Sequence, residues 1–325
     1  MKYLLRRLGF YLVAALASIT LNFAIPRMMP GDPASAMMSR FQGQLRPEAL
    51  QALRAAFGFT NEPLHLQYVR YLSHLLSGDM GISISYFPSP VTSVIGLGLL
   101  WTILLAGLAV IISFALGNLL GVIGAWRRGG LVDSVLPPLL TFVGSFPYFF
   151  LAMTALFFLG FRLNWFPLRH AYSDTLAPNL SLEFVLDVIW HMILPASCIV
   201  LVSVGGWMLT MRNTMIGTLA EDYIIMAEAK GLPQRRIMFN YAARNALLPN
   251  ITAFGMALGY VLGGQLLTEI VFAYPGLGYM LLQSVRTQDY PLMQGLFLMI
   301  TFAVLGANLI VDLLYTRLDP RVRQA

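Results

Sequence analysis

Residues 96–126 read GLGLLWTILLAGLAVIISFALGNLLGVIGAW, an apolar run without a single charged side chain. About 20 mostly apolar residues are enough for a helix to cross the hydrocarbon core of a bilayer. This stretch is therefore predicted to be a transmembrane helix. Other charge-free apolar runs of similar length are predicted to be transmembrane helices for the same reason.

Five further charge-free windows complete the predicted bundle: 8–26, 134–160, 191–211, 249–268 and 290–311. The fourth span, 191–211, carries the weakest signal, because His191 and Pro195 stand near its start and Gly205-Gly206 interrupt it. In membranes, neighbouring helices can provide hydrogen-bond partners for the backbone groups that Pro and Gly leave free. The window is therefore kept as a span. We expect an all-α protein with six transmembrane helices, forming one transmembrane domain over residues 1–325.

The first window also has the outline of a signal peptide, with basic residues before it and Ala15-Leu16-Ala17 as a cleavage site. The apolar run continues past that point to Ile25, and further spans follow. An uncleaved first helix is therefore expected.

The composition agrees with a membrane environment. Of the 325 residues, 58% are hydrophobic and only 11% are charged, whereas a soluble domain is roughly 25% charged. The net charge of +6 could suggest nucleic acid, but the basic residues are scattered singly between apolar stretches and form no patch. We expect membrane lipid as the surroundings and no nucleic acid as a partner. The single cysteine, Cys198, excludes an intrachain disulfide.

The distribution of Lys and Arg sets the orientation. With the N-terminus inside, 13 of the 21 basic residues fall on the inner side, and five of the outer eight lie in the long segment 27–95. Long loops count least in the positive-inside rule, so the short loops decide. Both termini are predicted to be cytoplasmic, which requires an even number of spans.

The segment 27–95 is the predicted extracytoplasmic part. One amphipathic helix is expected to start near Arg46, with Leu50, Leu53 and Phe57 on one side, and a second to cover Leu64–Leu76. Both are expected to pack on the outer ends of the bundle or to lie at the membrane interface. Structural capping and docking of a partner both remain open as roles.

The predicted cytoplasmic loop 213–248 is the most informative stretch. Glu221 and Asp222 favour a helix start, Lys230 favours its end, and Gly231 is a natural stop. Pro233 suits the first position of a second helix that runs to about Leu248. Ordinary connections are only a few residues long, so a structured insert of this size implies a function.

Two functions for this loop remain open at this point. The pair of helices could bind anionic headgroups, or it could act as a lever that docks into a groove of another protein. Small residues at Ala227, Ala229 and Gly231 favour the lever, because they allow a close approach that headgroup binding does not require.

Several kinds of chemistry are absent from the sequence. There is no Gly-x-x-x-x-Gly-Lys-Ser/Thr for ATP and no His-Glu-x-x-His for zinc. His65, His170 and His191 are too far apart in the sequence to suggest metal ligands. Ser145 with His191 could hint at an intramembrane serine protease, but no Gly-x-Ser-x-Gly is present.

Acidic residues in the spans are few, and the sequence places each near a helix end, where it could reach an interface: Asp133, Asp312 and Glu269. Charges inside a membrane are costly and usually functional. Their scarcity argues against a proton-coupled transporter.

A set of short motifs resembles the permease subunits of ABC importers, in particular the dipeptide/oligopeptide/nickel subfamily of binding-protein-dependent systems. The motifs run along nearly the whole chain: Pro30-Gly31-Asp32-Pro33, Gly78-Asp79-Met80-Gly81, Ala229-Lys230-Gly231-Leu232, Arg244-Asn245-Ala246-Leu247-Leu248-Pro249, Tyr274-Pro275-Gly276-Leu277-Gly278 and Asp319-Pro320-Arg321. The loop before the fifth span is similar to the EAA loop of that family. The literal Glu-Ala-Ala is absent, since Ile225, Met226 and Ala227 occupy its positions.

The resemblance implies a type I ABC-importer permease fold in the cell (inner) membrane. The chain would be one of two related permease subunits that form the pathway. Two cytoplasmic ATPases would bind the ATP, and a solute-binding protein would deliver cargo outside. The chain would thus be no enzyme and would hold no cofactor. Peptides are the expected cargo, oligosaccharides or nickel are the alternatives, and an ion-coupled secondary transporter is the rival from another class.

The resemblance implies one group of site residues, and the residue pattern after the fifth span suggests a second. The ATPase-coupling loop would use Glu221, Asp222, Tyr223, Ala227, Ala229, Lys230 and Gly231. The stretch after the fifth span is charge-free from Ile270 to Val285 but is broken by Pro and Gly. It is expected to be a re-entrant turn and short helix at the pore or outer gate, or an outer loop that seals the two permeases together. Its candidate residues are Glu269, Tyr274, Pro275, Gly276 and Gly278.

Overall fold

The computed structural model describes residues 2–28, 62–261 and 265–318. In this part every regular element is a helix, and Ile82 and Pro90 form an isolated antiparallel bridge. The all-α prediction is therefore confirmed. Three expectations lie outside the described residues: the motifs at 30–33 and 319–321, and the amphipathic helix near Arg46.

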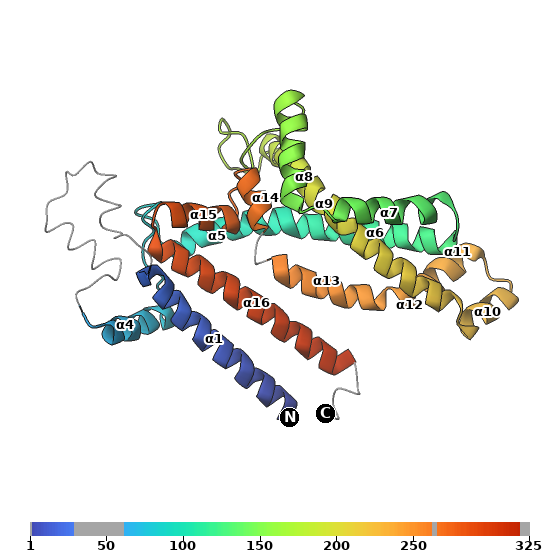
Figure 1. The fold of residues 1–325 in the computed structure, drawn as a ribbon, viewed down its shortest axis with the longest axis horizontal. Coiled ribbons are helices and arrows are strands. Elements are labelled where there is room, and N and C mark those ends of the chain that lie inside the picture. The colour runs from blue at the N-terminus through green and yellow to red at the C-terminus, as the bar shows by residue number, and fades with distance from the viewer. Residues whose placement is uncertain (1, 29–61, 262–264, 319–325) are drawn as a thin grey trace. The chain divides into compact units, whose positions relative to one another are not determined.

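The chain forms two compact units. The first contains residues 1–102, 262–266 and 275–325, and the second contains 103–261 and 267–274. Figure 1 shows the helices of both.

The described residues of the first unit include the helices α1 (Lys2–Met28), α4 (Leu64–Leu76), α5 (Val91–Thr102), α15 (Leu277–Arg286) and α16 (Tyr290–Leu318). α1 runs beside α16 (Figure 1). The Asn22 amide donates to the Gln294 carbonyl at 2.7 Å, and the Gln294 amide donates to the Asn22 carbonyl at 3.2 Å. α5, α15 and α16 enclose an apolar core made of Val91, Val94, Ile95, Leu277, Met280, Leu292 and Leu296.

A buried carboxylate fastens the loop before α5 to the start of α16. Asp289 is fully buried. It accepts the Ser83 hydroxyl at 2.5 Å and the Ser85 amide at 2.7 Å, and it caps α16 through the Leu292 amide at 3.1 Å. Hydrogen bonds to a charged acceptor are strong, which fixes this loop against the helix.

The second unit is organised around α6 (Leu108–Trp126), which follows the π-helix η1 (Ile103–Gly107), and α9 (Leu182–Leu219). Glycines bring these two helices into backbone contact. A Cβ at Gly117 would lie 2.8 Å from the Val204 carbonyl oxygen, and one at Gly121 would lie 2.7 Å from that of Met208. Such small-residue contacts are how helices pack closely inside membranes.

The fourth predicted span is longer and more regular than expected. α9 contains Pro195 and passes through Gly205-Gly206 without interruption. Gly205 faces α7 (Leu131–Gly144), where a Cβ would stand 3.1 Å from Leu140. The two glycines were expected to interrupt the run, but Gly205 instead supplies space for a neighbouring helix.

The third predicted span is broken. α7 ends at Gly144, and α8 (Tyr148–Ala155) continues into the π-helix η2 (Leu156–Arg162) after a bend of 92°. Pro147 lies at the break. A proline lacks an amide donor and keeps the residue before it out of helical geometry. Window 134–160 is therefore two helices and not the single helix that its apolar composition predicted.

The described residues contain four helices that are long and apolar enough to cross a membrane, or five if the bent pair counts as one span. They are Arg6–Met28, Val91–Trp126, Leu182–Leu219 and Tyr290–Leu309. Window 249–268 holds α13 (Leu248–Val261) and the start of α14 (Leu266–Val271) on either side of residues 262–264, which are not described. The count of six is not confirmed.

The glycine contact between α6 and α9 leads to a stability prediction. Gly121→Ala forces a Cβ into the α9 backbone, and overpacking of this kind costs about 1–3 kcal/mol. We expect the thermal unfolding temperature in detergent to fall. The matched control is Gly206→Ala on α9, where nothing lies within 4 Å of the added Cβ. Its unfolding temperature should stay the same or rise, because Ala favours helix. Equal unfolding temperatures of the two variants would contradict the close packing of α6 against α9.

Candidate functional site

The loop between α9 and α13 folds as a hairpin of short helices. It contains α10 (Asp222–Ala229), α11 (Gln234–Arg236), the π-helix η3 (Ile237–Ala243) and α12 (Arg244–Ala246). We call residues 222–246 the α10–α12 hairpin. π-helical turns are frequent at functional sites.

The sequence signals at both ends of α10 are confirmed. Glu221 is the extended N-cap residue, and Asp222 lies in the first turn. At the other end the Gly231 amide donates to the Glu228 carbonyl at 2.8 Å, and the Leu232 amide donates to that of Ala227 at 3.3 Å. This pair of bonds is a Schellman motif, which needs a left-handed residue. Gly231 has φ +69° and meets that need.

The start of the second helix differs from the prediction by one residue. Pro233 has extended geometry, with φ −57° and ψ 136°, and it precedes the helix as the N-cap residue. The helix therefore begins at Gln234. The Arg236 and Ile237 amides both donate to the Pro233 carbonyl, so this residue still organises the first turn.

The inward face of the hairpin is part of the core of the second unit. Ile224 and Ala227 are only 2% and 3% exposed. They pack in one cluster with buried residues of α6, α9 and the rest of the hairpin: Val122, Ala125, Met211, Met215, Ile237, Ala242, Ala243 and Ala246. The Asn245 amide also donates to the Tyr223 hydroxyl at 2.9 Å, which joins α10 to α12. The hairpin is thus packed onto the ends of α6 and α9.

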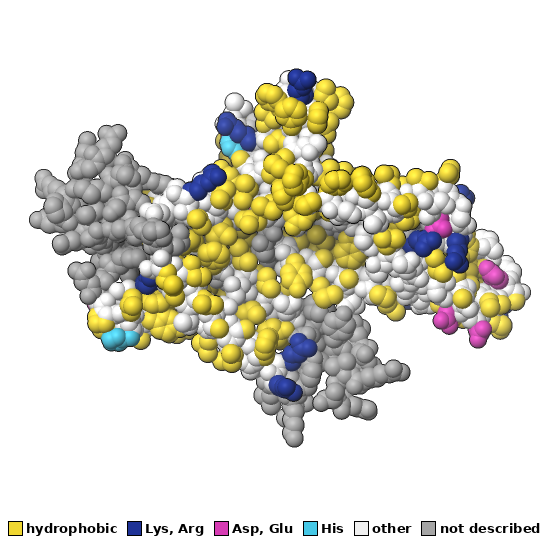
Figure 2. Space-filling model, viewed as in Figure 1, with side chains coloured by type: hydrophobic (Ala, Val, Ile, Leu, Met, Phe, Trp, Pro, Cys, Tyr) yellow, Lys and Arg dark blue, Asp and Glu magenta, His cyan; other side chains and the backbone are white. Residues whose placement is uncertain are grey.

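The outward face of α10 carries both apolar and charged side chains. Tyr223, Ile225 and Met226 are 38%, 56% and 58% exposed. Four charged residues beside them are exposed and form no ion pair with any described residue: Glu221, Asp222, Glu228 and Lys230. Figure 2 shows acidic side chains gathered where α10 lies.

The predicted coupling residues divide between the two faces. Six of them are exposed: Glu221, Asp222, Tyr223, Ala229, Lys230 and Gly231. Ala227 is buried, so it does not lie on the surface that was expected to allow close approach. Ile225 and Met226 lie on the outward face instead, and the sequence reasoning did not select them. Ile224 and Ala227 are three residues apart, which places both on one face of a helix. This spacing was the signal in the sequence that Ala227 faces inward with Ile224.

A buried amide pair connects α13 to the α6–α9 pair, and sequence reasoning missed it. Asn250 is 1% exposed. Its amide donates to the Asn118 side-chain oxygen at 2.5 Å and to the Trp207 carbonyl at 3.3 Å. Asn118 in turn donates to the Phe114 carbonyl at 2.7 Å. A polar amide in an otherwise apolar span usually bonds across helices, and that was the signal to follow.

In the predicted gate segment a turn is followed by the short helix α15, as expected, and the turn is preceded by a further short helix, α14. Glu269 and Tyr274 lie in the second unit and are fully buried, and the Tyr274 amide donates to the Glu269 carbonyl at 2.8 Å. Pro275, Gly276 and Gly278 lie in the first unit, where Gly276 precedes α15 as its N-cap. The gate role of these residues stays a prediction.

Glu269 is more enclosed than predicted, whereas Asp133 lies near a helix end, as expected. Glu269 was expected to reach an interface, but its side chain is fully buried in the second unit. Asp133 forms an ion pair with Arg212 that joins α7 to α9. The side chain of Asp312 is outside the described part. Among described residues, no three His, Cys, Asp or Glu side chains are grouped to hold a metal ion.

Comparison with known proteins identifies similar chains over the full length. The model of the family described as "Binding-protein-dependent transport system inner membrane component" matches residues 117–324, and the model of its N-terminal part matches 1–115. The chain is 32% identical to the dipeptide transport system permease protein DppB of Lactococcus lactis subsp. cremoris and of Escherichia coli K12. It is 33% identical to the probable peptide ABC transporter permease protein y4tP of Sinorhizobium fredii. Each match covers 99% of both chains.

The burial of Ala227 leads to a prediction with a neighbouring control. Ala227→Arg places a cation in an apolar cluster, so we expect α10 to detach locally from the ends of α6 and α9. Hydrogen exchange of the amides in 224–246 should then rise by at least tenfold. Ala229→Arg, two residues away on an exposed position, should leave this exchange unchanged. Protection that survives Ala227→Arg would contradict the assignment of the inward face.

Proposed function

The chain belongs to the family of binding-protein-dependent transport system inner membrane components, and we propose that it is a permease subunit of an ATP-driven peptide importer. As a member of this family it is a multi-pass membrane protein that works with other transporter subunits. Its apolar helices fit that role. The names of the relatives, which refer to dipeptides and peptides, support peptides as the cargo over oligosaccharides or nickel.

In this proposal the chain forms half of the pathway, and a second related permease forms the other half. Two ATPase subunits bind and hydrolyse the ATP, because the chain has no P-loop of its own. The chain itself needs no cofactor. A solute-binding protein delivers the peptide from outside.

The observation that carries the proposal is the two-faced α10. Its inward face is buried with α6 and α9, while Tyr223, Ile225 and Met226 stay exposed on the other side. An apolar centre with a polar rim is the usual anatomy of a protein–protein contact. A partner that pushes on this face acts directly on two long helices. We therefore place the ATPase contact on the outward face of α10.

The charges of α10 favour a protein partner over lipid headgroups. Glu221, Asp222 and Glu228 outnumber Lys230 on this helix. Inner leaflets carry anionic lipids, which attract basic segments and repel acidic ones. The basic side chains Arg235, Arg236 and Arg244 belong to the second half of the hairpin.

The excess of Lys and Arg in the short loops supports cytoplasmic termini and a cytoplasmic hairpin. This orientation places the outward face of α10 on the side where ATPase subunits work. It also places the loop between α4 and α5 outside the cell, on the side from which cargo arrives.

The proposal is tested with the complex reconstituted in proteoliposomes. The readouts are uptake of a labelled dipeptide delivered by the solute-binding protein and hydrolysis of ATP. Met226→Glu puts a charge into the centre of the proposed contact, where hot-spot residues cluster, and losing a hot-spot residue costs about 2 kcal/mol or more. We expect uptake to fall by roughly tenfold and the ratio of uptake to hydrolysis to fall with it.

The control is Leu131→Glu, an exposed apolar residue at the start of α7, on the same predicted side. It should leave uptake and its ratio to hydrolysis unchanged. If Met226→Glu kept the unaltered ratio of uptake to ATP hydrolysis, the ATPase contact could not lie on the outward face of α10. Uptake by the chain without ATPases, driven by an ion gradient, would contradict the function and favour a secondary transporter.

A further inference from the structure

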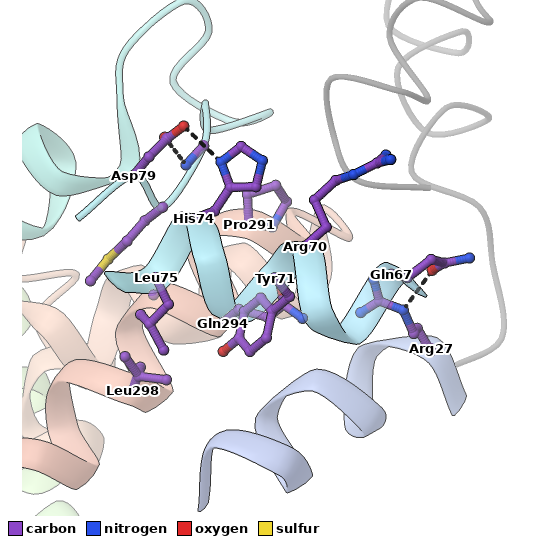
Figure 3. A pocket seen from close by; sticks show the side chains of 13 residues that line it. Arg27, Gln67, Arg70, Tyr71, His74, Leu75, Asp79, Pro291, Gln294 and Leu298 are labelled. Atoms are coloured by element: carbon purple, nitrogen blue, oxygen red, sulfur yellow. Dashed lines mark hydrogen bonds and ion pairs between the residues drawn. The ribbon is translucent and has the colours of Figure 1, made fainter. Parts of the chain in front are cut away.

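A cavity in the first unit lies between the end of α1, α4 and the start of α16, and none of the coupling residues belongs to it. Its volume is about 150 Å³. Figure 3 shows the side chains that line it. The walls combine apolar residues, such as Leu75, Pro291 and Leu298, with a set of charged and polar groups.

The charges are arranged by sign along the cavity. Arg27 is half-buried at one end, and its Nε donates to the Gln67 side-chain oxygen at 3.2 Å. Arg70 stands one helical turn after Gln67. Asp79 lies at the other end, where it accepts the Gly81 amide at 2.9 Å and lies 3.2 Å from His74 Nδ1 (Figure 3). A ligand with separate negative and positive groups matches this order.

The depth of the cavity in the membrane follows from the way α4 is attached. Tyr68 shares a 2.8 Å hydrogen bond with Thr20, and Asn22 donates to the Tyr71 hydroxyl at 3.4 Å. Phe23 also packs against both tyrosine rings. These contacts lie in the last turns of the span Arg6–Met28. α4 is thus held at the end of a membrane-crossing helix, which is the level of the lipid headgroups.

α4 and the last turns of α1 also carry exposed apolar side chains that do not line the cavity. On α4, Leu64, Val69 and Leu76 are 65%, 62% and 89% exposed. On the last turns of α1, Leu21 and Met28 are 60% and 82% exposed. A short helix with exposed apolar residues at this level lies in the interface and contacts acyl chains.

We propose that the cavity binds the headgroup of a glycerophospholipid of the phosphatidylethanolamine type. The phosphate lies against Arg27 and Arg70, the ammonium group lies at Asp79, and the acyl chains follow the apolar surface of α1 and α4. Guanidinium groups match phosphate oxygens in geometry and charge. Basic pockets beside membrane helices bind lipid headgroups by the same chemistry.

Arg70 is able to take this role because its present partner is weakly held. It pairs with Glu62 at 2.7 Å, but the side chains are 49% and 36% exposed. Exposed ion pairs contribute little to stability, so a phosphate can replace the Glu62 carboxylate. The site concerns the anchoring of α4 and does not depend on which cargo the transporter carries.

The test uses the purified complex in a phosphate-free neutral detergent. Dihexanoyl-phosphatidylethanolamine, dihexanoyl-phosphatidylglycerol, inorganic phosphate and a dipeptide are titrated separately by calorimetry. We expect Arg27→Gln and Arg70→Gln each to weaken binding of both lipids by about tenfold, as for loss of a charged hydrogen bond. Asp79→Asn should remove only the preference for phosphatidylethanolamine over phosphatidylglycerol.

The matched control is Arg169→Gln, since Arg169 is also an exposed arginine in an ion pair, with Asp174 at 3.4 Å, and does not line the cavity. It should bind both lipids as the unaltered protein does. Thermal unfolding without lipid checks the fold of each variant, and Arg70→Gln is expected to unfold at the unaltered temperature.

Three results would overturn the proposal. If Arg70→Gln bound the lipids as tightly as the unaltered protein, the phosphate could not lie against Arg70. Inorganic phosphate binding as tightly as the lipid would make it a free-anion site. Displacement of the lipid headgroup by the dipeptide would make it a cargo site.

Discussion

The backbone contact between α6 and α9 is the constraint on which the second unit depends. Gly117 and Gly121 leave no room for a Cβ, so the two helices approach more closely than larger residues allow. Helices in lipid gain little from the hydrophobic effect on association, and close packing supplies the attraction. The α10–α12 hairpin is packed onto the ends of this pair, and Asn250 ties the start of α13 to it. A force on α10 therefore reaches three helices at once.

The parts of the fold that the sequence predicts well are those set by local signals. Charge-free runs identify α1, the 91–126 helix, α9 and α16, because a single segment of sufficient length and apolarity crosses a bilayer. The ends of α10 follow from Glu221, Asp222 and Gly231, whose effects on helix ends need no tertiary contact.

The features that sequence reasoning missed depend on tertiary neighbours. Pro147 marks a 92° bend, whereas Pro195 sits inside a continuous helix, so a proline alone does not predict which window is broken. Ala227 resembles Ala229 in sequence, but only Ala227 faces the ends of α6 and α9. Glu269 is enclosed by its own unit although its position in the sequence suggested a helix end at an interface. Each outcome is decided by what packs against the residue.

The central claim is that the hairpin moves as one body with the α6–α9 pair, and a distance measurement tests it directly. Cys198→Ala removes the single native thiol, and cysteines placed at the exposed positions Thr210 and Glu228 carry spin labels. Pulsed electron resonance on the complex gives the distance between α9 and α10 without nucleotide and with ATP trapped. We expect the same distance distribution in both states. A shift of several ångströms would show that α10 hinges on α9, which would contradict the rigid attachment.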